Sequence, residues 1–261
     1  MSDSRCITYI ATGKAYIDEA FFNARLSKVN SPTIPFCLFT DLFEYALSIN
    51  HDLVFENIYQ HDCPVFNYRD KISPLLHLPY DEILFLDTDA FISSSIDLTF
   101  NILKFYDIAA CYAPVRHPPG WNDASVPDFF PEINTGVLFF NNSPSFRQLV
   151  TDWLASYDLL FTSFNQSWDQ ASFRSVLWKA ISNRSLSLFI LPDEFNVRTT
   201  KPWIIGRGSP AYIIHGRYPS SELSRFLDYL NGDVDTFRTS SIWLTNNPHS
   251  SIRPRFDRTF E

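Results

Sequence analysis

The sequence predicts an α/β protein in which helices flank a mostly parallel, Rossmann-like central sheet. Across the first 90 residues, short apolar runs alternate with helical patterns, which is typical of right-handed βαβ units. The run 83–86 is apolar without polar alternation, as in a strand buried on both faces. Neither an internal repeat nor a domain boundary interrupts the pattern. We therefore expect a single domain over residues 1–261, with a C-terminal helix and tail over 221–261.

The composition is that of an ordinary globular protein. Of 261 residues, 45% are hydrophobic and 19% charged, and the net charge of -8 argues against a nucleic-acid partner, because phosphate backbones require a basic surface. The four cysteines show no C-x-x-C spacing, so we expect free thiols and no zinc site or disulfide framework. There is no basic-then-apolar leader and no apolar run of ~20 residues. These features favour a cytoplasmic location without a membrane span, and they specify no oligomeric state.

In the first part of the chain, apolar spacing and breakers define the elements. Ile17, Ala20, Phe21 and Ala24 recur at helical spacing, so one face of this helix should pack on the sheet. The expected elements are a strand over 5–11, a turn at 12–14, a helix over about 16–29, strands over 36–40 and 53–58, and a helix over 68–78 with Pro74 near its first turn.

In the second part, a long segment rich in Pro and Trp, residues 114–131, separates two strands. Aperiodic loops of this length often serve as lids or binding loops, and the alternative is a passive connection. The expected elements are strands over 107–112 and 137–140, helices over 145–160 and 168–181, strands over 188–191 and 212–214, and a helix over 222–230 that ends at Asn231-Gly232.

Two carboxylates follow the apolar run 83–86. Ligands of open α/β sheets bind beyond the carboxyl ends of the strands, and Asp87 and Asp89 are placed there with one residue between them. Such hard oxygen ligands suit Mg²⁺ or Mn²⁺, which usually hold phosphate oxygens as well. The alternative is an ordinary strand exit, in which short polar side chains cap backbone groups.

Other predicted strands also end or begin with polar groups. Thr12 follows the first strand, Asn134 and Thr135 precede the strand over 137–140, and His215 follows the strand over 212–214. Each has an ordinary explanation, and a lone His after an apolar strand is more often a hydrogen-bonded structural residue. Their convergence with the Asp pair on one crevice favours a metal-bound phosphate ligand.

Seven segments, in this order, resemble the GT-A glycosyltransferases of family eight, the group of glycogenin and the lipooligosaccharide galactosyltransferases. They run between residues 5 and 220. The segments are Ala11-Thr12-Gly13-Lys14-Ala15-Tyr16 (the nucleotide-reading turn), Arg69-Asp70-Lys71, Asp87-Thr88-Asp89 (the D-x-D), Asn134-Thr135-Gly136-Val137, Trp168-Asp169-Gln170, Leu191-Pro192-Asp193-Glu194-Phe195-Asn196, and Ala211 to Gly216 with the ligand His.

This resemblance implies a metal-dependent, retaining transferase that moves a hexose from a UDP-sugar to a hydroxyl of a saccharide or other acceptor. Mn²⁺ or Mg²⁺ would stabilise the departing diphosphate as a Lewis acid. The implied roles are metal binding for Asp87, Asp89 and His215; base recognition for Ala11, Thr12 and Tyr16; diphosphate or donor binding for Arg69, Lys71, Thr88, Thr135, Gly136 and Arg217; and catalysis at the donor sugar for Asn134, Asp169 and Gln170.

Structural alternatives apply to two of these assignments. Tyr16 is also explained as a helix residue that packs on the sheet. Asp169 is also explained as the N-cap of its helix, with Gln170 merely exposed.

After His215, the chain departs from the family pattern, in which a glycine and then K-P-W normally follow. Here Arg217 follows Gly216, while Lys201-Pro202-Trp203 lies upstream, so we expect Arg217 to replace the family's lysine.

Two other function classes compete with glycosyl transfer. Aspartyl phosphohydrolases also use a D-x-D after an apolar strand, but they place it on the first strand, with Thr or Val two residues after the second Asp, where this chain has Phe91. A non-catalytic nucleotide-sugar or carbohydrate binder would use exposed aromatics such as Trp121, Trp168 and Trp203.

Overall fold

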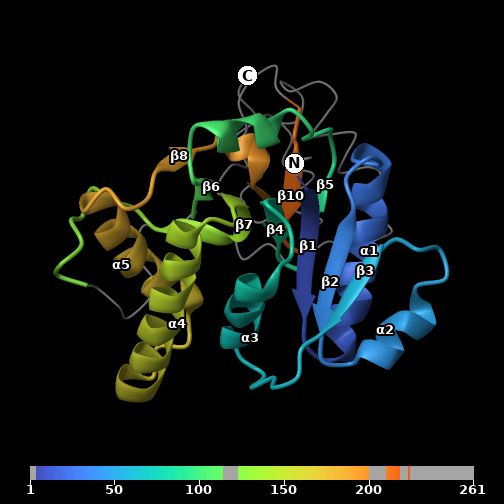
Figure 1. The fold of residues 1–261 in the computed structure, drawn as a ribbon, viewed down its shortest axis with the longest axis horizontal. Coiled ribbons are helices and arrows are strands. Elements are labelled where there is room, and N and C mark those ends of the chain that lie inside the picture. The colour runs from blue at the N-terminus through green and yellow to red at the C-terminus, as the bar shows by residue number, and fades with distance from the viewer. Residues whose placement is uncertain (1–3, 114–122, 200–209, 218–222, 224–261) are drawn as a thin grey trace, which may run out of the picture.

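The computed structural model describes residues 4–113, 123–199, 210–217 and 223, and Figure 1 shows a central sheet with helices on both sides. The strands are β1 (Arg5–Ala11), β2 (Phe36–Thr40), β3 (Asn57–Gln60), β4 (Glu82–Leu86), β5 (Ala90–Ile92), β6 (Ile108–Tyr112), β7 (Ile133–Asn141), β8 (Leu188–Ile190), β9 (Val197–Arg198) and β10 (Ile213–His215). The α-helices are α1 (Lys14–Asn30), α2 (Phe43–Ile49), α3 (Arg69–Ile72), α4 (Pro144–Phe164) and α5 (Asp169–Ser182), with 3-10 helices over Ser73–His77, Thr99–Lys104 and Asp193–Phe195.

In the described part of the chain, the main sheet has seven strands in the order β3-β2-β1-β4-β7-β6-β8. Its neighbours pair in parallel except for β7, which runs antiparallel to both β4 and β6. This confirms the prediction of a mostly parallel sheet. Because β7 is reversed, its first residues lie beside the carboxyl ends of β1 and β4, where Leu86 pairs with Val137.

The strand β4 is buried on both faces, as its unbroken apolar run predicts. Leu84 and Leu86 belong to the core that α1 covers, whereas Ile83 and Phe85 belong to the core that α3, α4 and α5 cover. Side chains alternate between the two faces of a strand, so a strand between two helical layers needs apolar residues at every position. The main sheet therefore separates two cores, and Figure 1 shows α1 and α4 on opposite sides of it.

A second sheet of three strands, in the order β5-β10-β9, was not predicted. The strands β5 and β9 contain three and two residues, too few for a periodic pattern. β10 runs antiparallel to β5, and His215 pairs with Ala90. The backbone N–H of Gly216 donates to the carbonyl of Asp89 at 2.9 Å. This small sheet is what brings His215 back to the D-x-D segment.

Three predicted elements are wrong in part. The strand expected over 137–140 already begins at Ile133, so Asn134 and Thr135 lie within it. The third strand begins at Asn57 rather than at 53, because Leu53 has a left-handed φ of 51° and closes a turn onto Asn50. The predicted helix over 68–78 is a four-residue α-helix followed by a 3-10 helix. Pro74 lies at the start of that 3-10 helix rather than in the first helical turn, since its missing N–H cannot continue the α-helical pattern.

The end of the predicted long loop is fastened to α5. Arg174 donates to the carbonyls of Phe130 and Pro127 at 2.8 and 3.1 Å, and Ser175 donates to Asp123 at 2.5 Å. Residues 114–122, Lys201–Trp203, the predicted helix over 222–230 apart from Leu223, and the tail lie outside the described residues.

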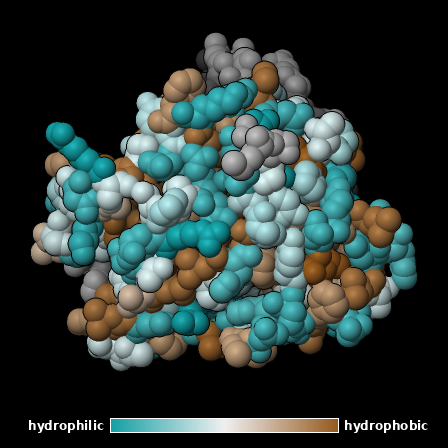
Figure 2. All heavy atoms as spheres, in the orientation of Figure 1, coloured by the Kyte–Doolittle hydropathy of each residue, from teal (hydrophilic) through white to brown (hydrophobic). Residues whose placement is uncertain are grey.

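The visible surface is mixed in character. Figure 2 shows hydrophilic residues around separate hydrophobic groups near the lower part of α4 and near α2. Exposed apolar side chains on these helices include Leu47, Leu159 and Phe164. Among the described helices, none combines the length and the apolar character that crossing a membrane requires.

Candidate active site

Three side chains meet where β4 and β10 end. Asp87 and Asp89 follow β4, and His215 ends β10. The Nε2 atom of His215 lies 3.2 Å from Oδ1 of Asp89 and 3.7 Å from Oδ2 of Asp87. One ligand atom from each residue lies within 4.8 Å of the others. Two carboxylates and an imidazole at this spacing are a donor set suited to a divalent cation such as Mn²⁺.

The orientation of His215 is fixed by Asn196. The Nδ1 atom of His215 lies 2.9 Å from Oδ1 of Asn196, and because an amide oxygen only accepts, Nδ1 carries the proton. In the neutral ring, the lone pair of Nε2 therefore faces the two carboxylates. Burial, and then the charge of Arg198, lower the pKa of His215 although Asp89 acts in the opposite direction. Such a partner on the other ring nitrogen is the usual support of a metal-binding histidine.

Gly136 leaves room for the Asp-Asp-His group. A Cβ atom at this position would lie 2.3 Å from Cε1 of His215 and 2.4 Å from Oδ2 of Asp87. Its carbonyl accepts the backbone N–H of Asp87 at 2.8 Å. The backbone of β7 thus forms one wall of the site, and only glycine fits there.

Lys71 connects the Asp pair to the start of α5. Its Nζ lies 3.1 Å from Oδ1 of Asp87 and 3.0 Å from Oδ2 of Asp169. Burial disfavours the charge on Lys71, but the two carboxylates outweigh this and raise its pKa. Thr135 donates to the same oxygen of Asp169 at 2.5 Å. A charged lysine therefore neutralises one residue of the Asp-Asp-His group and one residue of the expected catalytic set.

The expected catalytic residues Asn134, Asp169 and Gln170 lie together. The Nδ2 atom of Asn134 donates to Oε1 of Gln170 at 3.1 Å. The N-cap of α5 is Trp168 rather than Asp169, and Gln170 is only 7% exposed. The structural alternative for this pair, an N-cap beside an exposed glutamine, is therefore wrong.

Solved structures with a similar fold include the galactosyltransferase LgtC in complex with donor and acceptor sugar analogues. LgtC is 18% identical, with a TM-score of 0.59 over 82% of this chain and 88% of that one. An active-site mutant of LgtC is 16% identical, with a TM-score of 0.59 over 96% of this chain and 98% of that one. LgtC is a GT-A protein of family eight. The chain has the GT-A fold.

A glycosyltransferase of Streptococcus pneumoniae TIGR4, GlyE, shares the GT-A fold at 16% identity, with a TM-score of 0.55 over 82% of this chain and 55% of GlyE. No protein-family model matches the sequence, and no curated protein matches it either. The predicted fold class is thus confirmed by the architecture.

In this GT-A fold, the predicted nucleotide-reading turn joins β1 to α1. Ala11 is buried at the end of β1, and Gly13 has a φ of 83° and donates its N–H to Oδ1 of Asp41 at 2.8 Å. Tyr16 is 51% exposed, so the alternative in which it packs on the sheet is wrong. Tyr16 lies on α1, just after the turn that contains Thr12 at the carboxyl end of β1.

Two of the expected diphosphate-binding cations are paired with acids. Nε of Arg69 lies 3.0 Å from Oδ1 of Asp158 on α4. Nε of Arg217 lies 2.7 Å from Oε1 of Glu19, whose other oxygen accepts from Oγ1 of Thr88 at 2.6 Å. Glu19 thus ties the middle of the D-x-D segment to the residue that follows Gly216.

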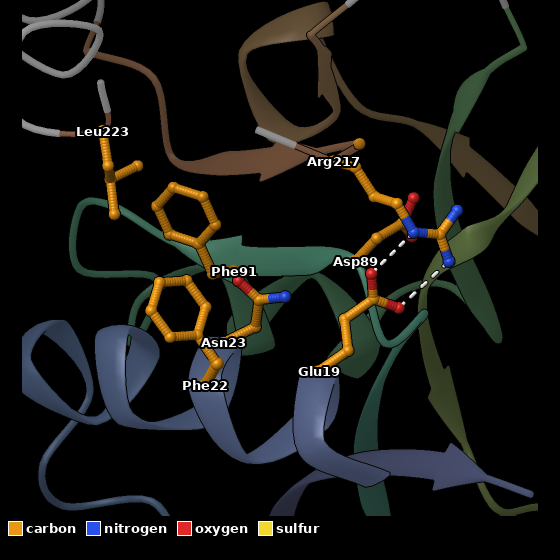
Figure 3. Close-up of a pocket in the computed structure, with 8 residues that line it drawn as sticks. Glu19, Phe22, Asn23, Asp89, Phe91, Arg217 and Leu223 are labelled. Carbon is orange, nitrogen blue, oxygen red and sulfur yellow. Dashed lines mark hydrogen bonds and ion pairs between the residues drawn. The ribbon is translucent and has the colours of Figure 1, made fainter. Parts of the chain in front are cut away.

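A pocket of 270 Å³ opens beside Asp89. Figure 3 shows Phe22, Phe91 and Leu223 at one end of it, and the Arg217–Glu19 pair with Asp89 at the other. The pocket therefore lies between α1 and Asp89 of the Asp-Asp-His group, and its far end is apolar.

Sequence reasoning missed three residues of this region: Glu19, Glu132 and Asn196. Asn196 lies in a segment that resembles the family, so its presence was visible but its contact with His215 was not. No spacing in the sequence indicates that Glu132, just before β7, reaches Gln170 on α5.

Proposed function

We propose that the chain is a metal-dependent, retaining glycosyltransferase that moves a hexose from a UDP-sugar to a hydroxyl of a saccharide or other acceptor. The observation that supports this most directly is the Asp-Asp-His group next to the Asn134, Asp169 and Gln170 cluster, within a GT-A fold. LgtC, which has this fold, has been solved with donor and acceptor sugar analogues.

Asp87, Asp89 and His215 would hold Mn²⁺ or Mg²⁺, which on binding supplies a Lewis acid for the diphosphate. Glycine at 136 and the Asn196 contact fit such a group, because they leave space and direct the lone pair of Nε2 at the carboxylates. Lys71 holds Asp87 and Asp169 in place through its two ion pairs.

In the transfer, the bond between the anomeric carbon and UDP breaks, and its electron pair leaves with UDP. The acceptor oxygen bonds to the same carbon, and its proton is released. Asn134, Asp169 and Gln170, held in place by hydrogen bonds to one another and to Thr135, would face the donor sugar, on which positive charge develops. Tyr16 would stack on the base, with Ala11 and Thr12 at its edge. Thr88, Thr135, Gly136, Arg69 and Arg217 would surround the diphosphate, which requires both arginines to leave their acidic partners.

The test is UDP release from a panel of UDP-hexoses, measured with Mn²⁺ and after chelation. We expect Asp87→Asn and Asp89→Asn each to lose at least about a hundredfold of the Mn²⁺-dependent rate. Asp52→Asn, in an exposed pair with Arg25, is the control and should retain the wild-type rate. Full Mn²⁺-dependent turnover in both site variants would overturn the proposal.

Two further measurements separate the alternatives. Thermal stabilisation by Mn²⁺ and a UDP-sugar identifies the donor, because a ligand that prefers the folded state raises its Tm. Stabilisation without any turnover would favour a non-catalytic binder. The anomeric configuration of the product, read by NMR, tests retention.

We further propose that the protein resides in a reducing compartment, the cytoplasm, because its four cysteines are free thiols.

A further inference from the structure

Glu132 is a buried carboxylate that the transfer as described above does not use. It lies directly before β7 and has no exposed surface. Its Oε1 accepts a hydrogen bond from Nε2 of Gln170, whereas its Oε2 is buried without a hydrogen-bond partner among the described residues. A buried carboxylate with an unpaired oxygen is costly to keep in a folded protein, which suggests a role beyond packing.

A chain of hydrogen bonds links Glu132 to the wall of the metal site. The backbone N–H of Gly136 donates to Oδ1 of Asn134 at 3.1 Å. A backbone N–H can only donate, so it fixes which end of the Asn134 amide is the oxygen. Nδ2 of Asn134 then donates to Oε1 of Gln170, and Nε2 of Gln170 must find an acceptor on its other side. Glu132 is that acceptor.

The direction of this chain determines how Gln170 is presented. Gly136 lies against His215 and Asp87, so the Asn134 side of Gln170 is the side nearer the Asp-Asp-His group. The amide oxygen of Gln170 therefore lies toward this group, and its nitrogen lies toward Glu132. A reversed amide would place two donors, those of Asn134 and Gln170, against each other.

We propose that Glu132 is a positioning residue that holds the Gln170 amide with its oxygen toward the donor sugar. This inference rests on the proposed function. Its carboxylate, accepting from the amide N–H, also draws electron density toward the amide oxygen, as hydrogen bonds in chains polarise one another. An electron-rich oxygen at this place stabilises the positive charge that develops on the sugar as UDP leaves.

The charge on Glu132 depends on pH near neutrality. Burial raises its pKa to about 7, against the hydrogen bond from Gln170, and of the charged groups on α5, Asp169 adds to the shift while Arg174 opposes it. The carboxylate therefore forms as the pH rises through about 7. We expect kcat of the wild-type protein to rise over the same range.

Two substitutions separate the acceptor from the charge. Glu132→Gln keeps an acceptor oxygen but cannot titrate, so we expect its kcat to stay at the low-pH level of the wild type and to show no rise near pH 7. Glu132→Leu removes the acceptor, so kcat should fall by about tenfold or more while KM for the donor changes by less than about threefold. Glu44→Gln, exposed on α2, is the control and should leave both kinetic constants and the pH profile unchanged.

The proposal is overturned if folded Glu132→Leu keeps a kcat within about twofold of the wild type, or if Glu132→Gln keeps the rise near pH 7. A protein without turnover of any UDP-sugar would refute the proposed function instead. In that case the ¹⁵N side-chain amide signal of Gln170, assigned by its loss in Gln170→Glu, decides the positioning role. It should titrate near pH 7 in the wild type and stay constant in Glu132→Gln, and a signal that does not titrate in the wild type would refute the contact.

Discussion

Replacement of Gly136 by alanine tests the geometry of the Asp-Asp-His group. The added Cβ would lie 2.3 Å from Cε1 of His215 and 2.4 Å from Oδ2 of Asp87. Non-bonded carbon atoms approach to about 3.5 Å, so the ring, the carboxylate or the β7 backbone must move by about 1 Å. Since the ligand distances of a metal site hold within about 0.2 Å, this displacement is several times what the site tolerates.

The expected loss follows from this displacement. Disturbing the support of metal ligands typically lowers metal affinity by about 10- to 100-fold, which corresponds to about 1.4–2.7 kcal/mol. Crowding of the buried site should also lower the free energy of unfolding by about 1–3 kcal/mol. Electron paramagnetic resonance of free Mn²⁺ during a titration measures the first loss, and urea unfolding measures the second.

Gly13→Ala is the matched control for Gly136→Ala. Gly13 has a φ of +83° and no atom within 4 Å of an added Cβ, so alanine there is strained but does not touch the metal site. It should lose about 1–2 kcal/mol of stability and keep its Mn²⁺ affinity. If folded Gly136→Ala binds Mn²⁺ within about twofold of the wild type, the reasoning from this contact is refuted.

Three other substitutions address the groups around this site. Lys71→Met leaves Asp87 and Asp169 without their shared counter-ion, so the free energy of unfolding at pH 7 should fall by about 3–5 kcal/mol in urea, while Lys71→Arg should lose less; a loss under about 1 kcal/mol would contradict the role of the lysine. Asn196→Ala frees the His215 ring and should weaken Mn²⁺ binding by about tenfold or more in the same resonance titration; unchanged affinity would show that another contact orients the ring. Because the pKa of Glu132 rises from 4.5 to about 7 on folding, the wild type loses stability relative to Glu132→Gln as the pH rises through this window, by about 3 kcal/mol in total, and parallel unfolding curves from pH 4 to pH 8 would contradict it.

Much of the candidate site could be predicted from the sequence because parallel strands end at the same edge of a sheet. The carboxyl ends of such strands meet at one edge of a sheet, so Thr12 after β1 and Asp87 after β4 were expected at the same edge, and the structure pairs these two strands directly. The segment around Asn134 was placed correctly for a different reason from the one expected. It begins a reversed strand, and its first residues reach the same edge because β7 runs antiparallel.

The contacts that set the orientation and charge of these residues could not be predicted from the sequence. Glu132 and Gln170 are 38 residues apart and lie on different elements, and nothing in their spacing indicates a hydrogen bond. The short strands β5 and β9 carry no periodic signal, yet they bring His215 to Asp89. The pairing of Arg217 with Glu19 depends on the packing of α1 against the small sheet.

The sequence by itself determined the fold class and indicated the main residues of the candidate site. Its apolar runs define the strands, and the polar residues at their ends are fixed by covalent connectivity. The tertiary structure decided which of these groups are charged, which way their amides and rings face, and why position 136 requires glycine. Those properties depend on burial and on partners from distant segments, and a residue's charge and orientation are set by the neighbours that folding provides.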